Sequence, residues 1–529
     1  MTVSAPRTSA WAPLRLAAFR SLWLAVLASN VGTWMQTVGA QWLLVDQPGA
    51  ATLVALVQTA SMLPVLLLAL PAGALADIFD RRRLLIAVQG FLAATGVLLT
   101  GLTAADRMPP ALLLTLTFAI GVGQALTLPA WQAVIPELVP REQLVSASAL
   151  GSISVNLARA VGPAVAGVLI AQAGVAVVFG LNALSFAIFA VALLRWRPEH
   201  RESEPTPERF TAAMRAGGRY VRHSPVVRRI LLRVAFFVVP GSALWALLPL
   251  VASSRLGLGS GGYGVLLAAL GLGAVAGAVV LPRLRLLLSD SQLLLLAGLL
   301  FGGTLLVLAL VPRALPVTVA LVPAGLAWMT VLSSVNAAMQ LFLPGWVRAR
   351  GLSVYQMVFA GGQALGALAW GALGALAGLE AALVAAGVTM AVCASTVLVW
   401  PLRDTRGVNR DPVVYWPEPH LALTAHPRTG PVVVTVGYTV PPERQEAFVE
   451  AMRAVGRSRR RTGAIRWGLF RAGEREHGFV EVYQVPSWEE HLRQHGGRLT
   501  GADRVAEERA RALVDGDPEV THLLPADPD

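Results

Sequence analysis

The sequence contains no lysine, and only 14% of its 529 residues are charged. Soluble globular proteins carry roughly 25% charged residues, so this deficit indicates a different class of protein. The single cysteine, Cys393, lies in an apolar run, which excludes a disulfide framework and a thiolate metal site. Without lysine the chain also has no G-x-x-x-x-G-K-[ST] motif, so the sequence gives no sign of an ATP-driven pump.

What the sequence has in abundance is apolar residues, which make up 55% of the chain. A helix needs about 20 consecutive apolar residues to cross the ~30 Å hydrocarbon core of a bilayer. Stretches of this kind recur between residues 21 and 400, and we therefore predict an all-α polytopic membrane protein with twelve transmembrane helices. The expected spans are residues 21–45, 51–76, 84–104, 110–132, 145–171, 175–194, 230–253, 262–281, 292–311, 315–338, 350–376 and 380–400.

Arginine is distributed unevenly over the loops between these spans. Residues 1–400 hold 25 arginines against 12 acidic residues, whereas residues 401–529 hold 18 against 19. In the first region one set of alternating loops carries 21 arginines and the other set 3, and Arg159 alone lies deep in a span. The positive-inside rule therefore predicts that both termini are cytoplasmic in a bacterial-type inner membrane. Because the excess positive charge belongs to the membrane region, we expect no nucleic-acid partner.

Changes in composition divide the chain into six segments. We expect an N-terminal arm (1–20), a first six-helix bundle (21–194), a basic central loop (195–229), a second six-helix bundle (230–400), a linker rich in proline and charge (401–430) and a small C-terminal domain (431–525).

The two predicted bundles contain equivalent features at one offset of 204 residues. This offset pairs Gly73 with Gly277, Arg81 with Arg285, Pro140 with Pro344, Gly162 with Gly366 and Gly167 with Gly371. Glycine is common in these spans, so a single coincidence carries little weight. Several coincidences at the same offset, in loops and helices alike, indicate an internal repeat.

Polar residues inside the predicted spans are costly in a bilayer, so their spacing is informative. They form stripes at helical spacing, which predicts a water-accessible cavity between the two bundles. The alternative is that they merely join helices through hydrogen bonds, each worth about 0.6–2 kcal/mol. The residues expected to line the cavity are Asn30, Trp34, Thr37, Gln41, Gln124, Asn156, Arg159, Asn336, Gln340 and Gln363.

Arg159 is the most informative of these residues. An unpaired arginine at the centre of a transmembrane helix costs at least ~2.5–3.5 kcal/mol. One hypothesis is that it anchors an anionic or catechol-like substrate. The other is structural, because a helix kink at Gly162, Pro163 and Gly167 would free backbone carbonyls that Arg159 can bind.

Residues 431–525 read as strand, helix, strand, strand, helix and strand, the order of a ferredoxin-like α+β domain. The expected elements are residues 432–440, 442–459, 463–471, 478–485, 487–514 and 519–524. Trp467 and His491 are candidates for chemistry, but the chain has no asparagine after Asn409. His491 and His495 lie one helical turn apart, and we interpret them as solvated rather than as metal ligands. We expect no metal site and no catalytic residues. The basic run 457–461 suits either an anionic inner leaflet or a plain solvated face.

Several stretches carry a resemblance to a known family. Between the second and third spans, "PAGALADIFDRRRLLIA" (71–87) resembles the signature motif of the major facilitator superfamily. The matching residues are Gly73, Asp77, Arg81, Arg82 and Arg83, whereas Asp80 stands where the family often has a second glycine. The stretches "LPAWQAVIPELVPREQL" (128–144), "NLARAVGPAVAG" (156–167) and "VRARGLSVYQMVFAGGQALGALAWG" (347–371) resemble the enterobactin-exporter-like branch, also called transmembrane secretion effectors.

This resemblance implies a secondary transporter, an efflux permease for a siderophore, drug or secondary metabolite that works by alternating access. It implies that Asp77 and the motif arginines tie helices together when the cavity faces outward. Proton motive force is the implied energy source, and no cofactor is expected. The C-terminal domain is similar to the antibiotic-biosynthesis-monooxygenase type of dimeric α+β barrel, which implies a possible homodimer. The alternatives are a membrane-tethered enzyme that uses this domain, or a non-transporting sensor.

Overall fold

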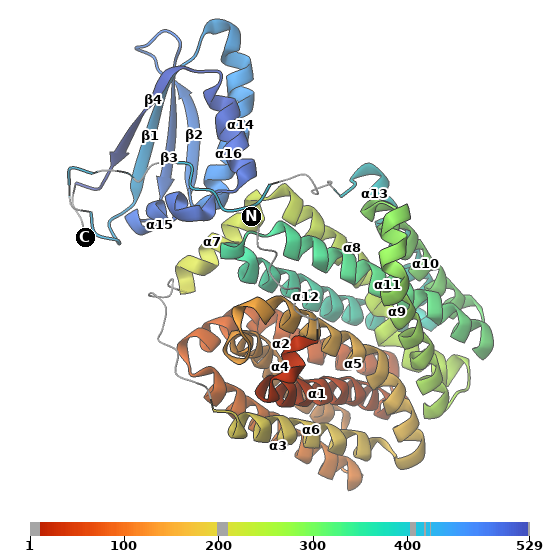
Figure 1. Ribbon diagram of the computed structural model, residues 1–529. Coiled ribbons are helices and arrows are strands. Elements are labelled where there is room, and N and C mark those ends of the chain that lie inside the picture. The colour runs from red at the N-terminus through yellow and green to blue at the C-terminus, as the bar shows by residue number, and fades with distance from the viewer. Residues whose placement is uncertain are drawn as a thin grey trace. The chain divides into compact units, whose positions relative to one another are not determined.

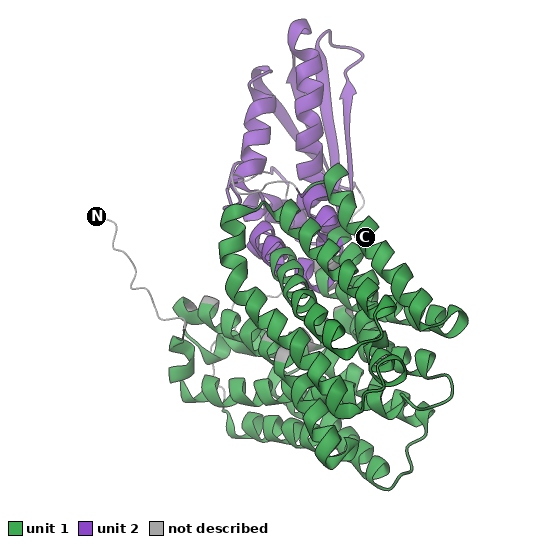
Figure 2. Cartoon of the chain, turned by 90° about the vertical axis from the view of Figure 1, so that its right-hand side faces the viewer, with its two compact units in different colours: residues 1–205, 232–335, 355–401 green, residues 206–231, 336–354, 402–529 purple. Residues whose placement is uncertain are grey.

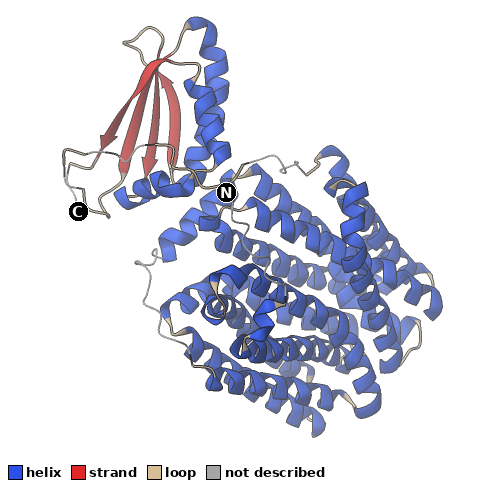
Figure 3. Ribbon diagram, in the orientation of Figure 1, coloured by secondary structure: helices blue, strands red, loops and turns tan. Residues whose placement is uncertain are grey.

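The computed structural model describes residues 11–197, 210–402, 409–416, 419, 421–423 and 425–526. Helices dominate the chain, and one four-stranded sheet forms near its C-terminus (Figure 3). The chain divides into two compact units. The first comprises residues 1–205, 232–335 and 355–401, and the second comprises residues 206–231, 336–354 and 402–529 (Figure 2).

Twelve long helices form the two predicted sets of six (Figure 1). The first set is α1 (Ala17–Leu43), α2 (Ala50–Ile78), α3 (Arg81–Ala104), α4 (Pro110–Leu138), α5 (Leu144–Ala173) and α6 (Val175–Arg195). The second is α8 (Pro225–Leu250), α9 (Ser260–Leu287), α10 (Asp290–Leu310), α11 (Ala314–Phe342), α12 (Gly345–Ala377) and α13 (Leu379–Val399). A shorter amphipathic helix, α7 (Phe210–His223), precedes the second set.

Within the described residues, eleven of these helices are long and apolar enough to cross a membrane, namely α2–α6 and α8–α13. Helix α1 has the required length, 27 residues. It carries polar residues that lower its hydropathy, including Asn30, Gln36 and Gln41. The prediction of a polytopic helical protein is therefore confirmed, with α1 as the most polar member of the twelve.

The repeat is visible in the packing of the two sets. Helix α3 packs against α6 in the first set, and α10 packs against α13 in the second. Gly162 of α5 lies against α1, where an added Cβ would be 3.0 Å from Val31 O. Its partner at the offset, Gly366 of α12, lies against α8, where an added Cβ would be 2.6 Å from Val239 O. Equivalent glycines therefore serve equivalent helix contacts.

The C-terminal domain has the predicted ferredoxin-like topology, with an antiparallel sheet in the order β2-β3-β1-β4. Its strands are β1 (Val432–Thr439), β2 (Arg466–Arg471), β3 (Gly478–Val485) and β4 (Asp515–Leu523). Its helices are α14 (Gln445–Thr462), α15 (Trp488–Arg493) and α16 (Gly501–Arg511). Alternate residues of β1 are buried in a core that includes Phe448 and Met452 of α14. One face of the sheet thus carries the core.

The predicted single helix over residues 487–514 is wrong. The structure divides it into α15 and α16, because Gly496 and Gly497 leave the helical conformation between them. Gly497 has a φ of 104°, a backbone conformation that glycine adopts readily. Helix α16 then starts afresh with a capping box between Thr500 and Asp503.

Candidate functional site

The two sets of six helices meet through close crossings at one end of the bundle. Gly167 of α5 lies against Gly264 of α9, so closely that an added Cβ would be 2.1 Å from Gly264 Cα. Gly371 of α12 lies against Ala55 of α2 in the same way, at 2.3 Å. Between α2 and α12, Thr59 also donates a hydrogen bond to the carbonyl of Ala364 over 3.0 Å. These crossings bring the two sets into direct contact at one end.

Polar and aromatic contacts reinforce these crossings. The amide of Gln41 in α1 donates to the carbonyl of Trp245 in α8 over 2.9 Å, and its oxygen accepts from Tyr263 of α9 at 3.3 Å. The ring of Trp42 stacks on Tyr263 with centroids 5.5 Å apart. Gln41 and Trp245 are themselves 204 residues apart, so equivalent positions of the repeat touch each other. Such a contact is expected near the axis that relates the two copies.

A small pocket lies beside these crossings. It is built by both sets of helices, with α5 on one side and α8, α9 and α11 on the other. Its lining residues are Arg159, Pro163, Trp245, Leu267, Leu270, Gly271, Ala274, Gly325 and Trp328. We call this cavity the central pocket. A cavity between two repeats of a helical membrane bundle is a common place for a ligand site.

Arg159 is the charged residue of the central pocket. Its guanidinium lies 5.6 Å from the ring centroid of Trp34, within range of a cation–π interaction. Its Nε is buried and has no hydrogen-bond partner. The structural hypothesis of a bond from this nitrogen to kink carbonyls therefore finds no support in the geometry. An arginine in such surroundings costs at least ~2.5–3.5 kcal/mol unless something else compensates it.

Aromatic rings form the wall next to Arg159. Trp245 lies between Trp34, at a centroid distance of 5.4 Å, and Trp328, at 5.5 Å. Phe237 and Phe301 extend this cluster behind Trp328. The indole nitrogens of both Trp245 and Trp328 are buried and have no hydrogen-bond partner. Sequence reasoning missed these two residues, because apolar spans full of tryptophan give no sign of which indole lines a cavity.

The predicted polar residues of the first set bond mainly to other residues of their own set of helices. Asn30 donates to Ser154 over 3.1 Å, and Gln124 donates to Thr33 over the same distance. Thr37 bonds to the backbone of its own helix. Of the predicted residues, Arg159 is among those that line the central pocket, together with Pro163. The side chain of Asn156 lies outside the described residues.

The second-set candidates lie in two different units. Gln363 belongs to the first unit and is buried, and its amide oxygen has no hydrogen-bond partner. Asn336 and Gln340 belong to the second unit, where Gln340 donates to Asn336 over 3.1 Å. That geometry is the i, i+4 pairing of one helix face.

The motif between α2 and α3 is held by local bonds. Asp80 caps α3 by accepting from the backbone N–H of Arg83 at 2.7 Å. Arg81 forms an ion pair of 2.9 Å with Glu137 of α4, and Arg82 donates to the carbonyls of Leu193 and Leu194 at the end of α6. Gly73 has open space where a side chain would be. The side chain of Asp77 lies outside the described residues, so its role stays a prediction.

Arg233 of α8 is a buried arginine that the topology count assigned to the basic face. It is 8% exposed and donates to the hydroxyl and carbonyl of Thr396 and to the carbonyl of Trp400. It therefore neutralises the carbonyl end of α13, where a cation is favourable. Sequence position alone places it near a helix end and cannot show this burial.

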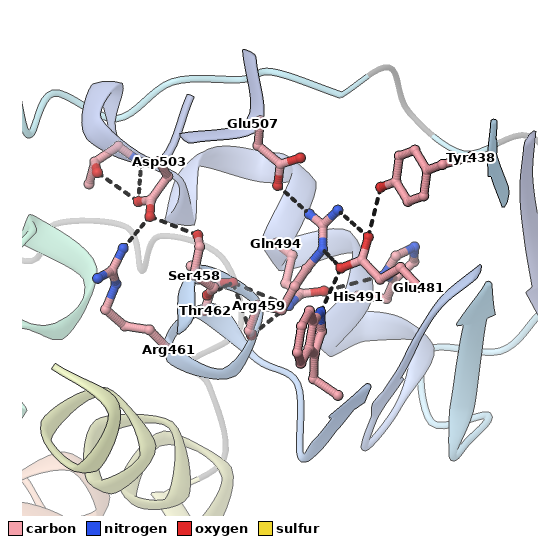
Figure 4. A network of polar contacts seen from close by, with 12 residues as sticks. Tyr438, Ser458, Arg459, Arg461, Thr462, Glu481, His491, Gln494, Asp503 and Glu507 are labelled. Atoms are coloured by element: carbon pink, nitrogen blue, oxygen red, sulfur yellow. Dashed lines mark hydrogen bonds and ion pairs between the residues drawn. The ribbon is translucent and has the colours of Figure 1, made fainter. Parts of the chain in front are cut away.

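The C-terminal domain contains a second cluster of buried charges (Figure 4). Arg459 of α14 forms two hydrogen bonds with Glu481 of β3, at 2.9 and 3.1 Å. Its Nη1 lies 2.8 Å from Glu507 of α16, without the alignment of a hydrogen bond. Glu481 also accepts from Trp467 and Tyr438. This arrangement ties both helices to the sheet.

The surroundings of Arg459 explain its charge state. Burial alone lowers its pKa, but the carboxylates of Glu481 and Glu507 outweigh this effect and hold the pKa well above the usual value. Its guanidinium also lies over the rings of Trp416, at 4.2 Å, and Tyr483, at 4.9 Å. Both interpretations of this arginine as part of a leaflet-binding or solvated run are therefore wrong, because it faces the domain core.

Three histidines gather beside this cluster. The Nε2 atoms of His491 and His522 are 3.0 Å apart, and the ring of His495 lies 4.7 Å from that of His491. His491 is fully buried, so the interpretation of a solvated histidine is wrong. Burial, with neighbouring His495 and His522, lowers its pKa to about 3. Within the described residues no group of three or more His, Cys, Asp or Glu side chains has the arrangement of a metal site.

The second unit also contains the ends of α8, α11 and α12 together with α7. Glu490 of α15 accepts from Arg219 of α7 at 2.7 Å and from Arg498 at 2.8 Å. Arg498 lies over the ring of Trp346 in α12, 4.7 Å from its centroid. Arg410 donates to the carbonyl of Leu341 at the end of α11 over 2.7 Å. The C-terminal domain is thus docked on helix ends rather than attached by its linker alone.

Comparisons with known proteins agree with this architecture. A family model described as "transmembrane secretion effector" matches residues 8–527. The staphyloferrin A transporter of Staphylococcus aureus is 25% identical over 52% of this chain and 70% of its own length. The enterobactin exporter EntS of Escherichia coli is 30% identical over 58% of this chain and 72% of its own length.

Solved structures show the same fold at low sequence identity. A bacterial homologue of the lysosomal transporter Spinster, described as inward-facing and unoccupied, superimposes with a TM-score of 0.57 at 16% identity. It covers 73% of this chain and 97% of its own. The nucleoside transporter NupG gives a TM-score of 0.60 at 10% identity over 72% of this chain and 99% of its own. Both likenesses concern the fold alone. On the evidence of the family match and of its relatives, the chain belongs to the transmembrane secretion effector family of major facilitator transporters and is a multi-pass membrane protein.

Proposed function

We propose that this protein is a secondary active exporter of small molecules that works by alternating access. The observation that carries the proposal is the central pocket, which both repeats build and which lies beside the helix crossings at one end. A pocket between two rocking bodies, open to one side at a time, is the geometry of such a transporter. Export is favoured because the curated relatives include a staphyloferrin A transporter and an enterobactin exporter.

The arginine distribution supports an orientation with both termini in the cytoplasm of a bacterial inner membrane. In that orientation α1 ends and α9 begins at the outer face. The crossings at Gln41, Gly167 and Tyr263 then seal the outer end, and the protein is in an inward-facing conformation. An exporter takes up its cargo in this conformation.

Proton motive force is the proposed energy source. The lysine-free sequence has no Walker-type phosphate loop, which disfavours ATP hydrolysis. Among the described residues that line the central pocket none is a carboxylate, so the group that exchanges protons lies elsewhere. The proposal includes no bound cofactor.

Transport by inverted membrane vesicles tests this function. Vesicles that contain the protein should accumulate enterobactin or staphyloferrin A when a proton gradient is imposed, and a protonophore should abolish the accumulation. Arg159→Ala should reduce the uptake rate at least tenfold at normal expression, since the buried charge faces the substrate. Equal accumulation by vesicles that lack the protein would refute export, and equal accumulation by the variant would refute the role of Arg159.

The C-terminal domain is proposed to be a docked, non-catalytic module that forms a homodimer. Helices α14–α16 cover one face of the sheet, whereas the other face presents Val433, Val482 and Phe470. Phe470 is 57% exposed and Leu523 at the edge is 51% exposed. An exposed apolar sheet face favours a second copy as its partner.

Mass measurement in detergent tests the dimer. Phe470→Asp should convert a dimer into a monomer, because a buried carboxylate in the shared face is strongly unfavourable. Glu450→Arg is the matched control, since Glu450 is an exposed residue on the helical side of the domain. A monomeric wild-type protein, or a dimeric Phe470→Asp variant, would disprove this interface.

A further inference from the structure

A patch of positive charge lies where α7 ends and α8 begins. Arg222 is in the last turn of α7, Arg228 is in the first turn of α8, and both side chains are exposed. His223 lies between them in the chain, and Arg460 of α14 is close enough to act on its imidazole. All four residues belong to the second unit. We call this group the basic patch.

No carboxylate balances the basic patch within the part of the chain that the structure describes. None of the ion pairs there involves Arg222, Arg228 or Arg460. Arg460 donates to a neutral acceptor, the carbonyl of Trp467, over 3.2 Å. Burial lowers the pKa of His223, and the positive charges of the arginines around it lower the pKa further. The patch thus holds like charges close together, and its complement is an anion.

Helix α7 presents this charge outward. Its Tyr220 is buried, and the ring of Tyr220 lies edge-on to Trp346 of α12 with centroids 5.7 Å apart. Gly217 lies so close to Arg350 that an added Cβ would be 2.8 Å from the Cβ of that arginine. Arg222 follows Tyr220 by two residues and therefore lies on the opposite side of the helix. The protein itself covers the apolar face of α7, and the exposed face offers charge.

The start of α8 places the basic patch at the surface of the membrane. Helix α8 with its extension, Pro225–Arg255, is long and apolar enough to cross a bilayer. Its apolar sequence begins at Ile230, and at 1.5 Å per residue Arg228 precedes this point by only about 3 Å. Ser224 alone separates α7 from α8, so Arg222 stays near the same level. The patch therefore lies at the depth of the lipid headgroups.

Phospholipid headgroups are the anions that this position favours. An anionic leaflet attracts arginines next to a membrane span, and the attraction is strongest within a Debye length of the surface. A headgroup phosphate is held at that depth by its acyl chains, whereas a soluble anion gains nothing from the neighbouring span. The charge and the position of the patch thus select the same partner.

We propose that the basic patch binds the headgroup of an anionic phospholipid and that this lipid ties the C-terminal domain to α7 and α8. Arg222 and Arg228 supply charge from the two helices, and Arg460 supplies it from the domain. Arg460 differs in this respect from its neighbour Arg459, which faces the domain core. A phosphate shared by all three elements bridges them through charge-assisted contacts. The inference does not depend on the cargo, direction or energy source of transport.

Native mass spectrometry of the purified full-length protein with added lipid tests the patch. The probes are dioleoyl phosphatidylglycerol, which is anionic, and dioleoyl phosphatidylcholine, which is zwitterionic and has the same acyl chains. We expect wild type to bind phosphatidylglycerol at least tenfold more tightly. The variant Arg222→Gln/Arg228→Gln should lose about fivefold in this affinity for each arginine, roughly 25-fold together. Its affinity for phosphatidylcholine should not change.

A matched control separates the patch from overall charge. The variant Arg453→Gln/Arg475→Gln also removes two exposed arginines from the second unit, but these pair with Glu450 and Glu519. It should bind phosphatidylglycerol like wild type. If the double glutamine variant at the patch fails to fold, Arg222→Gln alone should show the fivefold loss.

Amide hydrogen exchange in nanodiscs reports on the site itself. Residues 215–223 of α7 should exchange more slowly in phosphatidylglycerol than in phosphatidylcholine, because the bound headgroup joins α7 to the domain. Arg222→Gln/Arg228→Gln should abolish this difference, and Arg222→Lys/Arg228→Lys, which keeps both charges, should retain most of it.

Three results would overturn the inference. The first is equal affinity of wild type for the two lipids. The second is an equal loss of phosphatidylglycerol binding in the patch variant and the matched control, which would show an effect of overall charge. The third is slowing of α7 exchange by inorganic phosphate in phosphatidylcholine nanodiscs to the extent that phosphatidylglycerol produces, which would identify the ligand as a soluble anion.

Discussion

Arg159 and Arg459 are two buried arginines in opposite situations. Arg459 lies among the carboxylates of Glu481 and Glu507, whereas the Nε of Arg159 has no partner. A buried charge that is fully paired stabilises one geometry, and a buried charge left unpaired is costly. The protein keeps the paired arginine in a structural core and the unpaired one at a cavity. The presence or absence of carboxylate partners therefore separates the structural arginine from the functional candidate.

Glu507 gives a prediction at this scale. Burial raises its pKa to about 7, assisted by Glu481 and Asp503 and opposed by Arg459. Because the folded-state pKa lies above the ordinary value of 4.5, its stabilising contribution is complete below pH 4.5 and disappears as pH rises through 7. Relative to wild type, Glu507→Gln should gain on the order of 3 kcal/mol of domain stability between pH 4.5 and 8.

Amide hydrogen exchange of α16 and β3 in the full-length protein measures this difference. The comparison with Glu507→Gln is essential, because buried His491 contributes with the opposite sign. Its pKa is lowered to about 3, so its stabilising effect is present above pH 6.5 and is lost in acid. A constant difference between variant and wild type across this range would show that Glu507 titrates normally.

At the scale of helices, small residues set how closely the two repeats approach. Gly167 leaves no room for a side chain against Gly264, whereas Gly101 of α3 has nothing within 4 Å of an added Cβ. The internal repeat indicated that these glycines are equivalent, but the sequence did not show which of them form crossings. That distinction depends on which helix faces meet, and the glycine-rich spans have no single pattern that decides it.

Gly167→Ala should therefore lower vesicle transport at least tenfold while leaving expression intact, because one methyl group pushes α5 and α9 apart where they cross. Gly101→Ala is the control and should transport like wild type. Transport by Gly167→Ala at the wild-type rate would mean that this crossing is not needed in the cycle.

A second prediction concerns the contact between α7 and α15. Glu490→Gln should leave Arg219 and Arg498 without their shared carboxylate, and breaking a buried pair costs about 3–5 kcal/mol. We expect faster amide exchange in α7 as the docking loosens. Glu489→Gln is the matched control, because its pair with Arg493 is much more exposed and is worth about 0–1 kcal/mol. Equal exchange in the two variants would show that Glu490 does not hold α7.

For the whole molecule, deletion of residues 420–529 separates a transporter with a docked module from a membrane-tethered enzyme. The first set of helices, the central pocket and the crossings all lie outside the deleted segment. Vesicles with the truncated protein should retain transport, at a reduced rate because the helix ends of the second unit lose their partner. Complete loss of uptake in a correctly inserted truncated protein would favour the enzyme alternative.

The architecture was predictable because the sequence patterns that specify it extend over many residues. Twenty-residue apolar runs and strand alternation survive single substitutions, so both the helical fold and the ferredoxin-like order were correct. The lining of the central pocket was only partly predictable. Arg159 stands out as a charge in a span, whereas nothing in the sequence shows that Trp245 and Trp328 line the same cavity. The buried state of His491 depends on His522 of a distant strand, which local sequence does not show.

The hydrogen bond between Gln41 and Trp245 carries a trace of the origin of the protein. In a dimer of identical subunits, a residue on the two-fold axis meets its own copy and has to be self-complementary. Here the corresponding residues are a glutamine amide and a tryptophan carbonyl, joined over 2.9 Å. Fusion of two copies into one chain removed the requirement of self-complementarity, and each half was then free to take its own residue. Residues 41 and 245 thus occupy equivalent places in the repeat but differ in type, and the bond between them runs from a side chain to a backbone carbonyl.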